Sequence, residues 1–181
     1  MSVWELKTAS PDVYASLNMT EAQARSRIFV FDGKPREWKR RPTAEVYQEA
    51  REKDHLPRAD ISLMAAGSLV LNEKAAAALR PFLDQFGQFL EARVDGVVEY
   101  FFNVTNVVDC IDLDGSTRRS SGSIIKEAFK TDALPVGPAV FKDPRTALIR
   151  IYVNDAAREI LEDCVASNQL TGMKIAALGQ G

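Results

Sequence analysis

Apolar runs separated by turn signals fill the second half of the chain and predict β structure. Residues 89–94 and 97–104 are two such runs with Asp95-Gly96 between them. An Asp-Gly pair in this position is a strong signal for a β-hairpin. Residues 107–113 form a third run, which ends at Asp114-Gly115. We expect further strands at residues 27–31, 139–141, 148–153 and 173–178.

Two other segments have the sequence pattern of helices. Asn72 precedes the Ala-rich run 73–80, and Asn at this place caps the first helical turn. Pro81 lacks the amide that a helix interior needs, so we expect a kink or a new turn there. A stronger helix follows Asn154 or Asp155, because its apolar residues recur at helical spacing. These residues are Ala156, Ala157, Ile160, Leu161, Cys164 and Val165.

The stretch 34–59 is strongly polar, with eight Lys or Arg, five Asp or Glu and three Pro. Connections of this length without structure of their own are usually functional or disordered. We expect a long loop here, with one short helix at residues 44–53. An Arg- and Ser-rich loop is expected at 116–123, followed by a second short helix at 123–130.

These elements predict a single α+β domain over residues 1–181, with a mainly antiparallel sheet and a few helices, including the amphipathic one near the C-terminus. Hairpin connections outnumber strand–helix–strand units, which favours antiparallel over parallel pairing. The chain of 181 residues is long enough for a sizeable core. With 46% hydrophobic residues and a net charge of −2, it is typical of a soluble globular protein and not of one built to bind nucleic-acid backbone.

Several kinds of site have little support in the sequence. The N-terminus lacks a basic segment followed by an apolar core, and no apolar run approaches the ~18 residues of a membrane span, so we expect a cytoplasmic protein.

Cys110 and Cys164 lie in apolar contexts without CxxC spacing and predict free, buried thiols. His55 is the only histidine, which leaves too few ligands for zinc and argues against a histidine-based triad. We therefore expect no metal and no cofactor.

Residues 107–116, VVDCIDLDGS, resemble the first motif of haloacid-dehalogenase-type phosphatases. The resemblance implies Asp112 as the phosphoryl acceptor and Asp114 as its acid/base partner, in a magnesium-dependent reaction. Such a site also needs a lysine and further carboxylates. The acidic pair Glu162-Asp163 is expected on the solvent face of the last helix and so away from such a site. The simpler interpretation is a strand that ends in an Asp-Gly turn, with the phosphatase as the alternative. The candidate lysines are Lys126, Lys142 and Lys174.

A second resemblance extends over roughly residues 28–178. The matching segments are Phe29-Val30-Phe31-Asp32-Gly33, Ala59-Asp60-Ile61, Val70-Leu71-Asn72-Glu73-Lys74-Ala75, Leu79-Arg80-Pro81, Tyr100, Asn103-Val104-Thr105, Val107-Val108-Asp109, Asp112 and Leu170-Thr171-Gly172. In this order they resemble a family of bacterial immunity proteins from polymorphic-toxin loci, immunity family eleven, formerly a domain of unknown function. The chain departs from the family at Cys110 and in its Ala-rich helix.

This resemblance implies a non-catalytic protein that binds a cognate toxin and blocks it. It maps no interface, and Asn103, Asp109 and Asp112 are expected in buried or turn-forming roles. The candidate surfaces are the polar loops 38–54 and 114–123, because loops carry recognition more often than cores. Toxins with basic clefts would be complemented by carboxylates. The partner-binding candidates are Trp38, Glu45, Glu49, Glu52, Asp54 and Asp114. A third hypothesis, a nucleic-acid-associated domain, would use the cluster 38–41.

Overall fold

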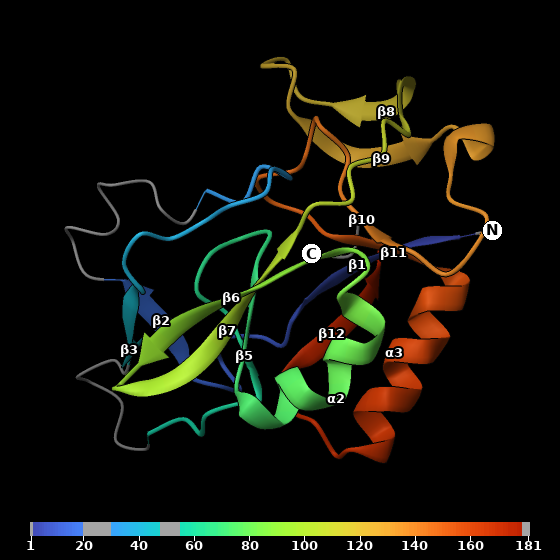
Figure 1. The fold of residues 1–181 in the computed structure, drawn as a ribbon. Coiled ribbons are helices and arrows are strands. Elements are labelled where there is room, and N and C mark those ends of the chain that lie inside the picture. Colours follow the sequence, from blue (N-terminus) through green and yellow to red (C-terminus); the bar gives the residue numbers. More distant parts are fainter. Residues whose placement is uncertain (1, 20–29, 48–54, 179–181) are drawn as a thin grey trace.

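The computed structural model describes residues 2–19, 30–47 and 55–178, which form two β-sheets, a projecting hairpin and helices packed against one side (Figure 1). The first sheet has four strands in the order β10 (Val140–Phe141), β11 (Tyr152–Asn154), β1 (Val3–Thr8) and β12 (Met173–Ala177). The second has six, in the order β2 (Ser16–Met19), β3 (Thr43–Tyr47), β6 (Gly87–Val94), β7 (Val97–Val104), β5 (Leu69–Leu71) and β4 (Ile61–Ser62). The hairpin is β8 (Ile111–Arg118) and β9 (Ile124–Phe129). The helices are α2 (Glu73–Leu83), α3 (Asp155–Ser167) and the 3-10 turn η1 (Thr131–Ala133).

The predicted α+β class with mainly antiparallel pairing is confirmed. Between the named strands described, only β3 and β6 pair in parallel. The β6–β7 hairpin forms where it was predicted, with φ angles of 47° at Asp95 and 85° at Gly96. Two successive positive φ values are those of the tight hairpin turn whose twist matches that of the strands.

The six-stranded sheet is buried on both faces, because successive side chains of its central strands point to opposite sides. On β7, Phe102 and Val104 belong to the main core, which also contains buried residues of α2 and α3. Phe101 points the other way, into a second apolar cluster with residues of β2, β3, β5 and β6. The edges of this sheet also meet, since the Leu17 amide donates to the Leu63 carbonyl at 2.8 Å. The sheet therefore curls around the second cluster.

The polar stretch after residue 30 covers this second cluster and differs from the prediction. Phe31 is 2% exposed and Trp38 is half-buried, with its ring edge-on to Phe101 at a centroid distance of 5.4 Å. Residues 43–47 form β3 instead of the start of a helix, because Ala44 and Val46 alternate inward against the second cluster. The rest of the helix predicted at 44–53 lies outside the described residues after Tyr47. Of the strand predicted at 27–31, the described residues Val30 and Phe31 are not in a strand.

Three further predictions of strand and helix position are corrected. Residues 124–129 form β9 and not a helix, because pairing with β8 overrides their local preference. Asp114-Gly115 lies inside β8, so the strand runs over 111–118 and not 107–113. β11 covers only the last part of the run 148–153, because residues 144–149 form turns.

The helices begin at the predicted caps. The Asn72 side chain accepts a hydrogen bond from the Ala75 amide at 2.9 Å, and α2 continues through Pro81 to Leu83. The Asn154 side chain accepts from the Ala157 amide at 3.1 Å and from the Ala139 amide at 3.2 Å. This second cap therefore also ties α3 to the loop before β10.

A polar junction around Asp60 joins α2, β4 and the segment before β12. Its carboxylate accepts hydrogen bonds from the Asn72 side chain at 2.9 Å and from the Thr171 amide at 2.8 Å. Burial raises the pKa of Asp60, but these hydrogen bonds and nearby Lys74 outweigh it and hold the pKa below the ordinary value. Gly172 has a φ of 90°, and a Cβ there would lie 2.1 Å from the Ile61 carbonyl oxygen. The Leu-Thr-Gly segment is thus fixed by packing and hydrogen bonding.

A buried lysine ties together three loops at the centre of the structure. Lys142 is fully buried, and its ammonium donates to the carbonyl oxygens of Phe31 at 2.7 Å, Gly67 at 2.7 Å and Ala147 at 2.8 Å. Burial lowers the pKa of Lys142 to about 8. The three hydrogen bonds match the three donors of an ammonium group and compensate for its removal from water.

We predict that Lys142→Met destabilises the fold by roughly 3 kcal/mol or more, because an apolar side chain leaves three buried carbonyls without their donor. Urea unfolding measures the loss. The matched control is Lys126→Met on β9, where the lysine is exposed and the expected change is within about 0.5 kcal/mol. Equal effects of the two substitutions would contradict the role of Lys142.

We predict that Asp60→Asn lowers stability at pH 7 by about 1–3 kcal/mol, because the amide presents a donor to Asn72 and a weaker acceptor to Thr171. The folded pKa lies below the ordinary 3.8, so the contribution of ionised Asp60 is present above that pH and is lost as the pH falls through the folded value. The stability difference between Asp60→Asn and the wild type should therefore shrink in acid. Asp163→Asn, exposed on α3, is the control, and a pH-independent difference would refute this account.

Candidate functional site

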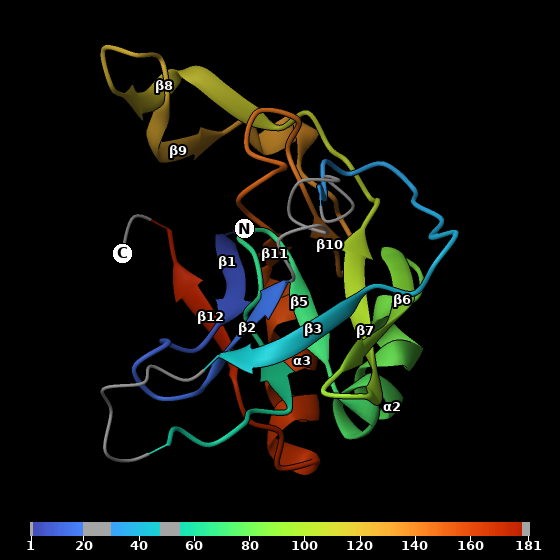
Figure 2. The same cartoon turned by 90° about the vertical axis from the view of Figure 1, so that its left-hand side faces the viewer.

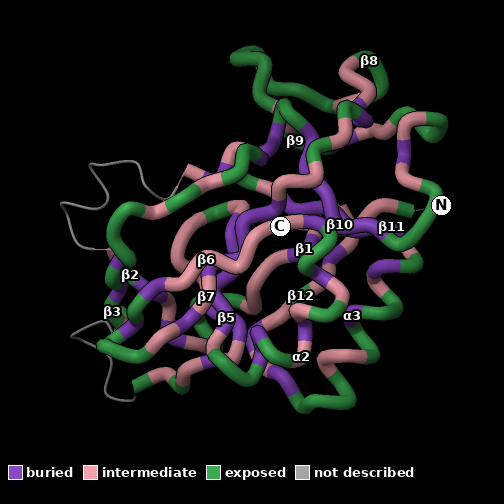
Figure 3. The backbone as a smooth tube through the Cα atoms, in the orientation of Figure 1, coloured by how far each residue is buried: buried purple, intermediate pink, exposed green. Residues whose placement is uncertain are grey.

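The β8–β9 hairpin projects from the body of the protein in both views (Figures 1 and 2). It pairs with neither of the larger sheets, and its far end is exposed (Figure 3). A two-stranded hairpin alone is marginally stable in water. Contacts at its base must therefore hold it in place, and the carboxylates singled out in the sequence lie there.

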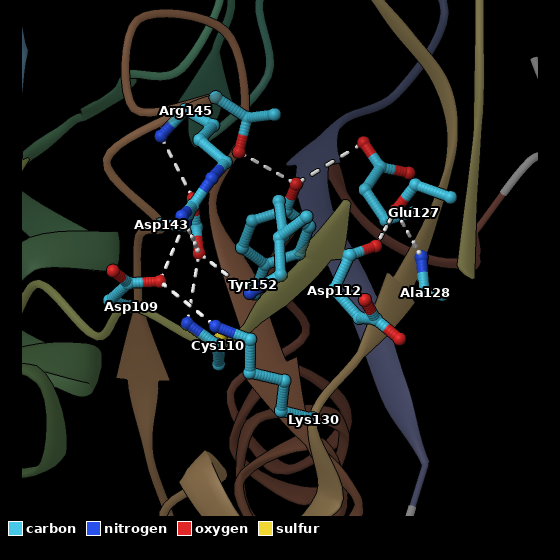
Figure 4. Close-up of polar contacts among 12 residues, drawn as sticks. Asp109, Cys110, Asp112, Glu127, Ala128, Lys130, Asp143, Arg145 and Tyr152 are labelled. Atoms are coloured by element: carbon cyan, nitrogen blue, oxygen red, sulfur yellow. Dashed lines mark hydrogen bonds and ion pairs between the residues drawn. The ribbon is translucent and has the colours of Figure 1, made fainter. Parts of the chain in front are cut away.

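Asp143 is the centre of this base (Figure 4). The residue is fully buried, and one carboxylate oxygen accepts the amides of Cys110 at 2.9 Å and Ile111 at 2.8 Å. The other oxygen accepts the Arg145 amide at 2.8 Å. The side chain thus fixes the first residue of β8 and the turn after β10 to one another.

Arg145 extends this contact to the surface. Its guanidinium donates to the Asp109 carboxylate at 2.6 Å and lies 3.4 Å from that of Asp143. The ammonium of Lys130, just after β9, lies 3.8 Å from Asp109. The hydrogen bond from Arg145 lowers the pKa of Asp109, although burial opposes it. Asp109 is therefore an exposed ion-pair partner between two cations, and not the buried or turn-forming residue that was expected.

A second set of contacts holds β9. The hydroxyl of Tyr152 donates to Glu127 at 3.2 Å and shares a hydrogen bond with Thr146 at 2.8 Å, and burial raises the Tyr152 pKa. Arg150 lies 2.7 Å from Glu127 and 2.8 Å from Glu5. Because Tyr152 and Arg150 belong to the first sheet or its approach, these contacts attach the hairpin to that sheet.

The phosphatase-like motif forms an irregularity in β8. The pairing of β8 with β9 shifts between Asp112 and Thr117. One carboxylate oxygen of Asp112 accepts the Asp114 amide at 3.0 Å, and the Ser116 hydroxyl donates to the Asp112 carbonyl and accepts the Ala128 amide. A Cβ at Gly115 would lie 2.9 Å from the Asp112 carboxylate. The Asp, Gly and Ser residues of the motif thus suit a β-bulge.

Of the three candidate lysines, Lys126 alone lies on the hairpin with Asp112, on β9. Lys142 is buried and engaged by three carbonyls, and Lys174 lies on β12 of another sheet. Glu162 and Asp163 are exposed on α3, as predicted. Over the described ranges no three His, Cys, Asp or Glu residues are placed to hold a metal ion.

The predicted partner-binding residues do not form one surface. Asp114 is exposed on the hairpin and Glu45 is exposed on β3, which lies apart from the hairpin in both views. Trp38 packs on Phe101 and is only partly accessible. Glu49, Glu52 and Asp54 lie outside the described residues.

Cys110 and Cys164 are free thiols, the first buried and the second half-buried. Burial raises the pKa of Cys110 to about 12, and the nearby Asp143 adds to the effect. Burial also raises the pKa of Cys164. Both groups therefore stay protonated at neutral pH and are weak nucleophiles.

Sequence reasoning missed the residues that hold the hairpin. Asp143 carried no site prediction, and Lys142 was only a candidate lysine of the phosphatase hypothesis. Four of their partners, Phe31, Gly67, Cys110 and Ile111, lie 32 to 111 positions away in the chain, and no spacing rule connects such positions. The one available signal was a charged pair, Lys142-Asp143, directly after the apolar residues 139–141.

No family model matches the chain, and no curated protein matches it. No helix in the described ranges is long and apolar enough to cross a membrane. The resemblance to immunity proteins therefore stays a prediction. Its signature residues Asp60, Asn72 and Thr171 lie in one structural junction, and the buried Asn103 donates to the Lys34 carbonyl at 2.9 Å.

We predict no magnesium-dependent hydrolysis of p-nitrophenyl phosphate above background, because the described residues form no carboxylate cluster that could hold the metal ion. Asp112→Asn should also keep its melting temperature, since an amide oxygen can still accept the Asp114 amide. Asp114→Asn is the second variant. Turnover in the wild type that disappears in both variants would establish the phosphatase instead.

Proposed function

We propose that the protein is an immunity protein that binds a cognate bacterial toxin through the β8–β9 hairpin and neutralises it by contact, without catalysis. The observation that carries the proposal is a projecting hairpin whose base is anchored by buried charges while its far end is left exposed. Rigid presentation of an exposed element lowers the ordering cost of binding. The immunity role itself comes from the sequence resemblance.

The division of residues between scaffold and surface agrees with this role. The matching segments of the resemblance supply the junctions at Asp60, Asn103 and Asp109. None of them falls in the hairpin tip, residues 114–123. Because the tip contains none of the matching segments, its residues can differ between proteins of this kind and match one particular partner.

The charge of the hairpin changes the kind of toxin surface expected. Asp114 is exposed at the start of this tip, but Arg118, Arg119 and Lys126 are exposed on the hairpin as well. Their excess of positive charge favours an acidic patch on the toxin over a basic cleft. Ile125, which is 47% exposed, adds an apolar contact among them.

A complex of nanomolar affinity corresponds to about −12 kcal/mol and commonly buries ~1,600 Å². The hairpin tip alone is too small for such an area, so neighbouring surface must contribute. Val136, just after η1, is 92% exposed, and Val107 at the hairpin base is 42% exposed. These residues extend the apolar part of the proposed interface beside the hairpin.

The test measures binding to the protein encoded directly beside this one, together with protection of cells that express that protein. We predict that the double variant Arg118→Glu with Arg119→Glu weakens binding at least about tenfold and reduces protection, because it reverses the charge of the tip. The matched control is Arg93→Glu, an exposed arginine on β6, which should bind like the wild type.

Two other outcomes would overturn parts of the proposal. Loss of binding in Glu45→Lys, with none in the hairpin variants, would move the interface to β3. Binding of a random-sequence RNA that depends on Arg118 and Arg119 would instead favour a nucleic-acid partner. Absence of both toxin binding and protection in the wild type would refute the immunity role.

A further inference from the structure

A cleft of about 370 Å³ opens where β11 separates from β1. Its floor is the end of β1 and the residues that follow, and its walls are the turn before β5 and the turn before β11. Its lining residues include Glu5, Lys7, Thr8, Gly67, Ile149 and Lys174. None of them belongs to the hairpin, so this is a separate surface.

The backbone of β1 presents an open edge to this cleft. The Leu6 amide donates to Ile151 on the β11 side, at 2.9 Å, while the Ala9 amide donates to Gly172 on the β12 side, at 2.7 Å. Because amides alternate in direction along a strand, the Thr8 amide points to the β11 side. β11 pairs only with residues 3–5 of β1, so this amide faces the cleft.

Two lysines give the cleft a positive rim. Lys7 and Lys174 lie directly opposite one another in the β1–β12 register, and like charges in this position repel. The carboxylate of Glu5 pairs with two cations, Arg150 at 2.8 Å and Lys7 at 3.5 Å, so it does not neutralise Lys7 alone. Lys174 is exposed and has no ion pair among the residues that the structure describes. The rim therefore favours an acidic group.

The walls of the cleft are apolar and held in place. Leu63, Ala66 and Ile149 line them, and Ile149 is 53% exposed. The carbonyls of Gly67 and Ala147, one in each wall turn, both accept hydrogen bonds from the ammonium of Lys142. The spacing of the two walls is thus fixed before any ligand arrives.

We propose that this cleft binds an extended, acidic peptide segment of a partner protein, which pairs with the open edge of β1. Its backbone accepts the Thr8 amide, one apolar side chain packs against Ile149 and Leu63, and carboxylates meet Lys7 and Lys174. Successive side chains of an extended segment point to opposite sides. Apolar side chains can therefore face the apolar walls of the cleft while acidic side chains face the lysines at its rim. The inference goes beyond the proposed function, because it requires neither the hairpin nor a toxin.

The test uses the full chain and two fluorescein-labelled seven-residue peptides, one of alternating Asp and Leu and one of alternating Lys and Leu. Fluorescence anisotropy should show saturable binding of the acidic peptide alone. Lys7→Glu and Lys174→Glu should each weaken it at least about tenfold, because each reverses a charge at the rim. Arg93→Glu is the control with the same charge change on β6, which does not line the cleft, and should bind like the wild type.

Thr8→Pro tests the strand pairing, because proline removes the amide that faces the cleft and keeps the bonds to β12. We expect a loss of at least about tenfold in peptide affinity with a melting temperature close to that of the wild type. Retained affinity in folded Thr8→Pro would overturn the edge pairing. No binding of the acidic peptide, equal binding of both peptides, or wild-type affinity in both lysine variants would overturn the site. Toxin binding is measured with the hairpin variants, so either proposal can fail alone.

Discussion

The rest of the structure depends on one buried cation, the ammonium of Lys142. It has no carboxylate partner within hydrogen-bond reach among the described residues and is satisfied by the carbonyls of Phe31, Gly67 and Ala147. Those carbonyls belong to the cover of the second cluster, the turn before β5 and the turn before β11. A buried charge is costly unless every donor is used, so the three loops are stable in this arrangement only together. The lysine thereby couples the two sheets without belonging to the apolar core of either.

The neighbouring Asp143 carries the same constraint to the hairpin. The backbone of Lys142 pairs with residues 106–108, which places the Asp143 carboxylate beneath the first amides of β8. One short segment therefore fixes the body through Lys142 and the hairpin through Asp143. Because the hairpin buries little surface of its own, its direction is set by this polar contact and by Glu127 and Tyr152.

The sequence predicted those elements of the fold that are determined by residues close together in the chain. The β6–β7 hairpin, the caps at Asn72 and Asn154 and the strand after Gly172 were predicted because a few adjacent residues determine each. The turn predicted at Asp114-Gly115 was wrong because Asp and Gly suit a β-bulge as well as a turn. Only the register with β9 distinguishes the two. β3 and β9 were predicted as helices since their burial comes from distant segments. The hairpin base was beyond sequence reasoning, because it joins residues far apart in the chain through buried charges.

The hairpin and the cleft are linked by a chain of charges. Glu127 on β9 contacts Arg150, which contacts Glu5 on β1, beside Lys7 at the rim of the cleft. Glu127 is nearly buried, so its pairing with Arg150 is little weakened by solvent. The two surfaces therefore hold fixed positions relative to one another, and a partner that contacts both meets them already arranged. Preorganisation of this kind raises affinity without further contacts.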